Sequence, residues 1–192
     1  PSAGIGRFVH AFAPSAWPQL RWTAIELSPI SAKLLGAVRP DIQVVNAPFE
    51  QWVTDNKHLQ GTYDLVVSNP PYGIRGKFAS IDREKGYGET RAYAYQVRRG
   101  IDHLRPGGIG VFLIPSGFVS GTSGELRALR ERVLQRAHFM GAFRLPSETE
   151  DGKSLFPGAL LVTDVVFLRS RGGTVARLPE ADQYIVEGRY FT

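Results

Sequence analysis

The strongest constraint on the fold of this chain is an alternation of apolar, β-rich runs with segments of helical pattern. The apolar runs lie at 21–27, 41–46, 62–69, 108–115, 137–146 and 160–170. Several runs are nearly continuous in apolar residues, as strands covered on both faces are. Helical patterns at 28–38, 88–104 and 123–136 separate them. The alternation predicts βαβ units, and hence an α/β fold with a mostly parallel, doubly wound sheet.

Local signals mark where the predicted helices begin and end. Ser28 has a side chain suited to an N-cap, and Pro29 follows it in the first turn, where its missing N–H costs nothing. The sequence "RPGG" ends the second helix, and the third begins at Ser123. Residues 70–89 show no periodicity. Because ligands of such sheets bind beyond the carboxyl ends of strands, this long loop is a functional candidate.

Composition and charge narrow the class of protein. The globular composition predicts one domain over residues 1–192, and the start at Pro1 inside a motif-like stretch predicts a fragment of a larger polypeptide. The chain has no cysteine and no apolar run long enough to span a bilayer, so we expect a cytoplasmic protein without a metal site or a membrane contact. The formal net charge of +5 favours a polyanionic partner, although a generally basic surface explains it too.

A glycine turn and an acidic residue suggest a nucleoside site. The chain opens with "PSAGIGRF", in which Gly4 and Gly6 permit a tight turn and a close approach of a ligand to the backbone. Glu26 ends the next predicted strand, about 20 residues later, where an acidic side chain accepts both hydroxyls of a ribose. The alternative for Glu26 is an acid that stabilises the start of the following helix. The spacing favours the nucleoside site.

The next strand ends in "VVNAPFEQW" and offers groups that suit an adenine ring. Asn46 and the backbone near Ala47 suit the edge of the ring, and Phe49 suits its face. Phe49 and Trp52 are also explained as core aromatics, which is the more frequent case. Taken together, the three strand ends describe a pocket for an adenosine-bearing ligand.

The apolar run "DLVVS" ends abruptly in Asn69-Pro70-Pro71-Tyr72. Two prolines remove two backbone donors and fix φ, so the segment presents rigid acceptors, namely the Asn69 side-chain oxygen and the Pro70 carbonyl. Such a site suits a planar amino group: accepting both of its hydrogens makes the nitrogen a better nucleophile in the transition state. Tyr72 supplies a flat face for stacking a ring. A strand-terminating turn is the alternative, since prolines commonly end strands.

The electrophile for such a nitrogen must come from the adenosine pocket. A sulfonium methyl donor fits, because its cationic centre is attracted to aromatic faces and carbonyl oxygens. The segment "SNPPYG", with "PSAGIGRF" before it and "LRPGGIGVFLIPSGFV" after it, resembles the adenine-specific DNA methyltransferases that act on the 6-amino group, especially those attached to large helicase or restriction polypeptides of plasmids and phages. The resemblance covers nearly the whole chain and implies a Rossmann-like methyltransferase fold, here without its N-terminal strand.

The resemblance also implies roles for individual residues. Asn69, Pro70, Pro71 and Tyr72 would hold the flipped adenine and form the catalytic set. S-adenosylmethionine would be held by Pro1, Ala3, Gly4, Gly6, Glu26, Leu27, Asn46, Ala47, Phe49 and Asn69. Three departures from the family stand out. The acidic residue that precedes the position of Pro1 in relatives is absent, and Pro48 stands where many relatives carry an aspartate for the adenine amino group. In addition, no separate target-recognition domain follows the last predicted strand.

The loop after the predicted catalytic turn, Asn69 to Tyr72, is basic, and it carries Arg75, Lys77, Arg83 and Lys85. In a DNA methyltransferase such charges neutralise phosphates beside the flipped base, and Phe78 or Tyr87 would fill the hole in the duplex. A solvated loop is the alternative for any single charge. DNA is therefore the expected partner, with helicase or restriction domains of the parent chain.

Two other functions remain open at the level of sequence. Methylation of a protein glutamine uses the same two-hydrogen geometry, although the basic loop argues against it. The third possibility is a degenerate DNA-binding module of a restriction complex, which binds DNA without turnover.

Overall fold

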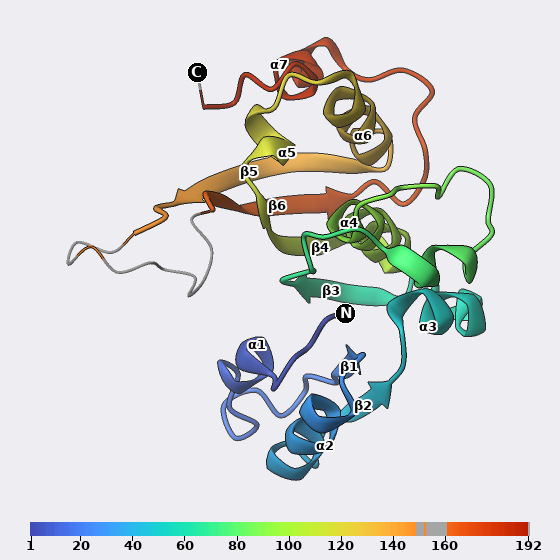
Figure 1. Ribbon diagram of the computed structural model, residues 1–192, viewed down its shortest axis with the longest axis vertical. Coiled ribbons are helices and arrows are strands. Elements are labelled where there is room, and N and C mark those ends of the chain that lie inside the picture. The colour runs from blue at the N-terminus through green and yellow to red at the C-terminus, as the bar shows by residue number, and fades with distance from the viewer. Residues whose placement is uncertain (149–151, 153–160, 192) are drawn as a thin grey trace. The chain divides into compact units, whose positions relative to one another are not determined.

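The computed structural model describes residues 1–148, 152 and 161–191 (Figure 1). These residues form two compact units. The first comprises Pro1–His58 and Val67–Gln96, and the second comprises Leu59–Val66 and Val97–Thr192. Strand β3 (Tyr63–Ser68) and helix α4 (Ala92–His103) therefore each contribute residues to both units.

The first unit is built around two short parallel strands, β1 (Thr23–Glu26) and β2 (Gln43–Asn46), which place Glu26 opposite Asn46. Its helical segments are α1 (Arg7–His10), α2 (Pro29–Val38), α3 (Phe49–Asp55) and the 3-10 helix η2 (Gly76–Ser80). The Ser28 side chain accepts a hydrogen bond from the backbone N–H of Ser31, so the predicted N-cap of α2 is confirmed. Leu35 of α2 and Val53 of α3 are fully buried and anchor the two helices in the core.

The second unit contains a four-stranded sheet in the order β3-β4-β6-β5. Its elements are β4 (Leu104–Pro115), α5 (Gly117–Ser120), α6 (Gly124–Leu134), β5 (Ala137–Leu145), β6 (Thr163–Ser170), the 3-10 helix η3 (Glu180–Asp182) and α7 (Gln183–Val186). A further 3-10 helix, η1 (Lys57–Leu59), precedes β3. Strand β6 is antiparallel to both neighbours, so β4 and β5 share one direction. The arrows of β3 and β5 point the same way in Figure 1, opposite to β6.

Apolar side chains from the middle strands form the core of the second unit. Phe112 and Ile114 of β4 and Val166 and Leu168 of β6 have no exposed surface. Arg130 of α6 is also fully buried. Its guanidinium donates to the carbonyl oxygens of three residues at the ends of α5 and α7, namely Phe118, Gly121 and Val186. A buried cation thus satisfies helix-end carbonyls that would otherwise lack donors.

These elements confirm the expected α/β fold, the mostly parallel direction of its strands and the alternation of strands and helices. The first correction is that the strands belong to two sheets instead of one, and β6 is reversed. The second is that the helix expected at 88–104 begins only at Ala92, because residues up to Arg91 belong to the preceding loop. The expectation of one domain over 1–192 stays a prediction beside the two compact units.

The described residues lack two features, a membrane-spanning helix and a cluster of metal ligands. Within residues 1–148, 152 and 161–191, every helix is too short or too polar to cross a membrane. The same part of the chain holds no group of three or more His, Asp or Glu side chains able to ligate a metal ion.

Candidate active site

All of the residues predicted to bind cofactor or base lie in the first compact unit. The glycine turn is bound to strand β1, because the N–H of Ala3 donates to the carbonyl oxygen of Ile25 at 3.0 Å. Gly4 and Gly6 have φ of 57° and 85°, which favours glycine. A Cβ on Gly6 would lie 2.3 Å from Leu35 Cδ1, whereas a Cβ on Gly4 would have no atom within 4 Å. Gly6 therefore permits close packing, and Gly4 borders open space.

The Glu26 carboxylate joins the glycine turn to the start of α2. Its Oε2 accepts a hydrogen bond from the N–H of Gly4 at 2.7 Å, and its Oε1 accepts one from the N–H of Ser28 at 2.8 Å. Each carboxylate oxygen has two acceptor positions, so these bonds leave capacity for two hydroxyl donors. Both predicted roles for Glu26, support of the helix start and acceptor for a ribose, are compatible with this geometry.

Asn46 and Ala47 form hydrogen bonds to the turn that follows β1. The Asn46 amide nitrogen donates to the carbonyl oxygens of Glu26 at 2.8 Å and of Leu27 at 3.1 Å. The N–H of Ala47 donates to the same Glu26 carbonyl at 3.2 Å. The donors that we expected to meet an adenine edge are thus engaged with the β1–α2 turn. This geometry favours a role for Asn46 in shaping the site over a direct role of its amide donors in reading a base.

The predicted stacking of Phe49 over a ligand is not supported. Phe49 is 6% exposed, and its ring is stacked on Trp52 and packs edge-on against Tyr95. Nearly all of its surface is therefore used in the core of the first unit, which is the alternative that the sequence left open.

The predicted catalytic turn, Asn69 to Tyr72, follows the end of β3. Asn69 and Pro71 are exposed, Pro70 is buried and Tyr72 is half-buried. The Tyr72 hydroxyl donates to the Asn69 side-chain oxygen at 3.1 Å. Burial raises the pKa of Tyr72 to about 12, so the hydroxyl remains a proton donor throughout the neutral range. No pattern in the sequence indicated this contact.

The prediction that Arg75 contacts DNA is wrong. Its side chain is 1% exposed and pairs with Glu50 of α3 at 3.1 Å. The guanidinium also donates to the carbonyl oxygens of Tyr87 and Glu89 and lies 3.7 Å from the centre of the Tyr95 ring. A side chain buried in this way cannot reach a phosphate. Arg75 instead holds the two ends of the loop together.

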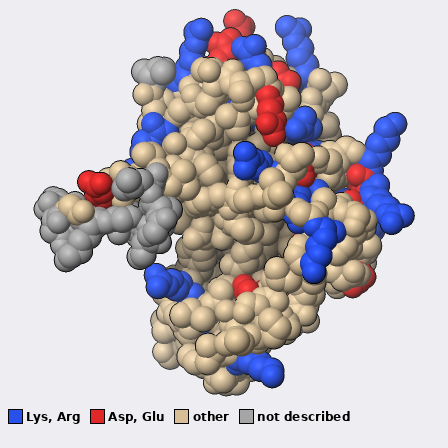
Figure 2. All heavy atoms as spheres, viewed as in Figure 1, with Lys and Arg blue, Asp and Glu red and all other residues tan. Residues whose placement is uncertain are grey.

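The other predicted DNA contacts lie on the surface of this loop. Lys77, Arg83 and Lys85 are exposed. Tyr87 is only 9% exposed, so its predicted insertion into the duplex is not supported, whereas Phe78 is half-buried. On the face shown in Figure 2, Lys and Arg side chains stand at several separate places instead of forming one continuous patch.

Glu50, the partner of Arg75, was missed because buried ion pairs between distant segments leave no periodic signal.

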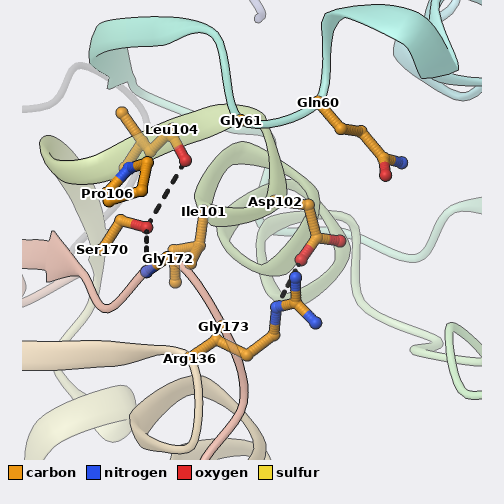
Figure 3. A pocket seen from close by; sticks show the side chains of 10 residues that line it. All are labelled: Gln60, Gly61, Ile101, Asp102, Leu104, Pro106, Arg136, Ser170, Gly172 and Gly173. Carbon is orange, nitrogen blue, oxygen red and sulfur yellow. Dashed lines mark hydrogen bonds and ion pairs between the residues drawn. The ribbon is translucent and has the colours of Figure 1, made fainter.

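A cavity of about 230 Å³ lies in the second unit (Figure 3). It is lined by residues that precede or begin β3, β4 and β5 and that end or follow β6, among them Gly61, Leu104, Arg136 and Ser170. Asp102 in its wall pairs with Arg136 at 2.7 Å and with Arg99 at 3.3 Å. The cavity contains none of the predicted site residues, and its charged groups neutralise one another, which favours a structural role.

Comparisons with known proteins decide the family. The family model described as Eco57I restriction-modification methylase matches residues 30–148, more than half of the chain. The matched range includes the predicted catalytic turn and the basic loop that follows it. This chain belongs to the Eco57I restriction-modification methylase family. This family member is 34% identical over 176 residues to the Defense against restriction protein B of Escherichia phage P1.

Solved structures with the same fold include methyltransferases of several kinds. The Type I restriction enzyme EcoKI M protein superposes with a TM-score of 0.69 at 20% identity, over 92% of this chain and 40% of that protein. A TehB-like SAM-dependent methyltransferase from Corynebacterium glutamicum superposes with a TM-score of 0.51 at 18% identity, over 88% of this chain and 77% of that protein. These likenesses show that this family member has the Rossmann-like fold of SAM-dependent methyltransferases.

The coverage of the relatives is uneven. The match to the phage protein takes in 92% of this chain but only 7% of that protein. The chain likewise corresponds to well under half of the EcoKI M protein.

Proposed function

We propose that this chain transfers a methyl group from S-adenosylmethionine to the exocyclic 6-amino group of adenine in DNA. One observation carries the proposal. Ser68, the residue before Asn69, donates its hydroxyl to the carbonyl oxygen of Pro1 at 3.0 Å. The acceptor-rich turn that suits an amino group is therefore joined directly to the glycine turn that suits the cofactor.

The residues of the glycine turn fit the cofactor. Open space borders Gly4, and the Glu26 carboxylate beside it retains acceptor positions for the two ribose hydroxyls. When bound, S-adenosylmethionine supplies an electrophilic methyl group on a sulfonium centre. The chain itself holds and orients the nucleoside through Gly4, Gly6 and Glu26, and Leu27, 51% exposed, offers an apolar side chain next to this acid.

The catalytic turn acts on the nucleophile. The Asn69 oxygen and the Pro70 carbonyl accept the two hydrogens of the amino group, which directs the nitrogen lone pair toward the methyl group. Pro71 keeps the turn rigid, because its ring fixes φ and it has no N–H. The ring of Tyr72 stacks on the base.

DNA is the substrate that accounts best for the loop after this turn. A base in a duplex must leave the stack before its amino group can enter such a site. Lys77, Arg83 and Lys85 project from the loop that follows Tyr72, and their charges suit the phosphates beside an extruded base. With this function, we propose that the protein acts in the cytoplasm. Helicase or restriction domains of the same polypeptide are its expected partners.

Methyl transfer from labelled S-adenosylmethionine tests the proposal. The natural protein is incubated with adenine-containing duplex DNA, with a duplex of only guanine and cytosine, and with a protein substrate that carries an exposed glutamine. The DNA is then hydrolysed, and the nucleosides are identified by mass spectrometry. We expect N6-methyladenine from the first substrate alone. Label in the protein would favour amide methylation, and DNA binding without label in any substrate would favour a degenerate module.

A further inference from the structure

Three buried or half-buried polar side chains connect the glycine turn to the catalytic turn. Ser2 has a φ of 53°, a left-handed conformation that a non-glycine residue rarely adopts. Its hydroxyl donates to the side-chain oxygen of Gln96 in α4 at 3.0 Å. This bond compensates for the unfavourable backbone conformation of Ser2 and holds the start of the glycine turn in place.

Ser68 completes the connection from the other side. Its hydroxyl oxygen lies 3.0 Å from the Pro1 carbonyl oxygen and 3.4 Å from the same Gln96 oxygen. Ser68 has one hydroxyl hydrogen, so the shorter contact to Pro1 is the stronger bond and the contact to Gln96 is a weaker branch. Ser68 is 1% exposed and Gln96 is 7% exposed, so water hardly competes for these bonds.

The position of this network in the sequence indicates its purpose. Ser68 immediately precedes Asn69, and Pro1 and Ser2 open the glycine turn that contacts Glu26 through Gly4. Methyl transfer needs the donor and the acceptor held in line at near-contact distance, and a displacement of about 1 Å costs on the order of 100-fold in rate. A network that ties the two turns together controls this distance.

We propose that Gln96 and Ser68 are positioning residues that fix the glycine turn relative to the catalytic turn, and so set the rate of methyl transfer. This inference rests on the proposed function, and it adds two residues that touch neither the base nor the reacting atoms. Gln96 serves as a shared acceptor, so an oxygen at its position matters more than its amide nitrogen.

Four variants of the natural protein test this role. Gln96→Leu keeps the approximate size and removes the acceptor, whereas Gln96→Glu keeps an acceptor for both serine hydroxyls. Ser68→Ala removes the hydroxyl that binds Pro1. Ser170→Ala is the matched control, because Ser170 is also a buried serine at a strand end, 5% exposed, with its hydroxyl 3.4 Å from a carbonyl oxygen.

Single-turnover methylation at saturating cofactor and DNA separates positioning from binding. We expect Gln96→Leu and Ser68→Ala to be slowed roughly 10- to 100-fold, with the affinities for cofactor and DNA changed less than about threefold. We expect Gln96→Glu to recover most of the rate and Ser170→Ala to match the parent. Parental rates for Gln96→Leu and Ser68→Ala would overturn the inference, as would equal losses in Gln96→Glu and Gln96→Leu.

A second measurement applies even if the parent protein methylates nothing. Amide hydrogen exchange reports whether Ala3 and Gly6, whose N–H groups are bound within the first unit, stay protected. We expect faster exchange at both amides in Gln96→Leu and Ser68→Ala, and parental exchange in Ser170→Ala. Unchanged protection would refute the network. An inactive parent with the expected exchange pattern would instead count against the proposed function alone.

Discussion

The Tyr72 hydroxyl is bound to the side-chain oxygen of Asn69, the atom that the proposed reaction assigns to the target amino group. The donor–acceptor distance is 3.1 Å. An amide oxygen has two lone pairs, so this bond uses one of them and leaves the other for a substrate. The substrate amine therefore meets an acceptor that already holds one hydrogen.

Tyr72→Phe tests the consequence of this bond. The variant keeps the ring that stacks on a base and frees the second lone pair of the Asn69 oxygen. Because a hydrogen bond of this kind has a net value of about 0.5–1.5 kcal/mol, we expect single-turnover methylation to rise about 2- to 12-fold. The comparison is with Tyr72→Ala, which loses the stacking platform and about 1–3 kcal/mol of base capture. A slower Tyr72→Phe would mean that the hydroxyl orients Asn69 instead of competing for it.

Asn69→Ala should separate chemistry from binding. The oxygen of Asn69 acts mainly in the transition state, so its removal should slow methylation ~100-fold or more while cofactor affinity stays close to parental. Single-turnover kinetics at saturating cofactor, with calorimetry for the affinity, give the two quantities. If the variant methylates adenine at the parental rate, the turn from Asn69 to Tyr72 only terminates a strand.

Glu26→Gln should weaken cofactor binding. The amide removes the charge and one acceptor oxygen. In the parent, the two carboxylate oxygens accept hydrogen bonds from the N–H groups of Gly4 and Ser28, and in the variant an NH₂ group would face one of these donors. Charge-assisted hydrogen bonds have values of about 1.5–3 kcal/mol, so we expect an affinity loss of roughly 10- to 100-fold in a calorimetric titration with S-adenosylhomocysteine. Thr23→Val on the same strand is the control and should leave the affinity unchanged. Equal affinities in parent and Glu26→Gln would remove Glu26 from the cofactor site.

Arg75→Gln should destabilise the first unit. It leaves Glu50 as a buried charge without its partner, and such losses cost about 3–5 kcal/mol in the free energy of unfolding, measured by urea denaturation. The double variant Arg75→Met with Glu50→Gln should lose less, because no buried charge is left uncompensated. A loss in the double variant as large as in Arg75→Gln would show that the other contacts of Arg75 dominate.

The exposed cations of the same loop provide the contrast with Arg75. Replacing Lys77, Arg83 and Lys85 together by glutamine should leave the unfolding free energy nearly unchanged. It should also reduce the slope of log affinity for DNA against log salt by about 2–3, since each phosphate contact contributes about 0.9. An unchanged slope would place the DNA contacts elsewhere.

His103 should make the protein less stable in mild acid. Burial lowers the pKa of its imidazole below the ordinary 6.5, because desolvation disfavours the charged form. The unfolded chain therefore takes up this proton at a higher pH than the folded protein. The stabilisation is complete above pH 6.5 and declines as the pH falls from there toward the folded pKa. Urea denaturation at several pH values should show a smaller acid loss in His103→Gln. His138→Gln controls for an exposed histidine whose pKa is also lowered, and equal acid losses in His103→Gln and the parent would contradict the expectation.

Much of the fold and part of the site followed from short-range patterns. The strands ending at Glu26, Asn46 and Ser68 and the cap at Ser28 were predicted because apolar periodicity and capping chemistry are written in neighbouring residues. The pairing order was not, since β6 lies between β4 and β5 through contacts between residues far apart in the chain.

The sequence alone determined which groups are available: a glycine turn, an acid at a strand end and a rigid Asn-Pro-Pro-Tyr turn, each of which lies within a few consecutive residues. Only the tertiary structure decided what each polar side chain contacts. It buried Arg75 against Glu50, engaged Asn46 with the β1–α2 turn and placed Gln96 between Ser2 and Ser68. The physical reason is that exposure and hydrogen-bond partners depend on which distant segments pack together. Two arginines with the same local sequence can thus be a surface cation in one fold and a buried anchor in another.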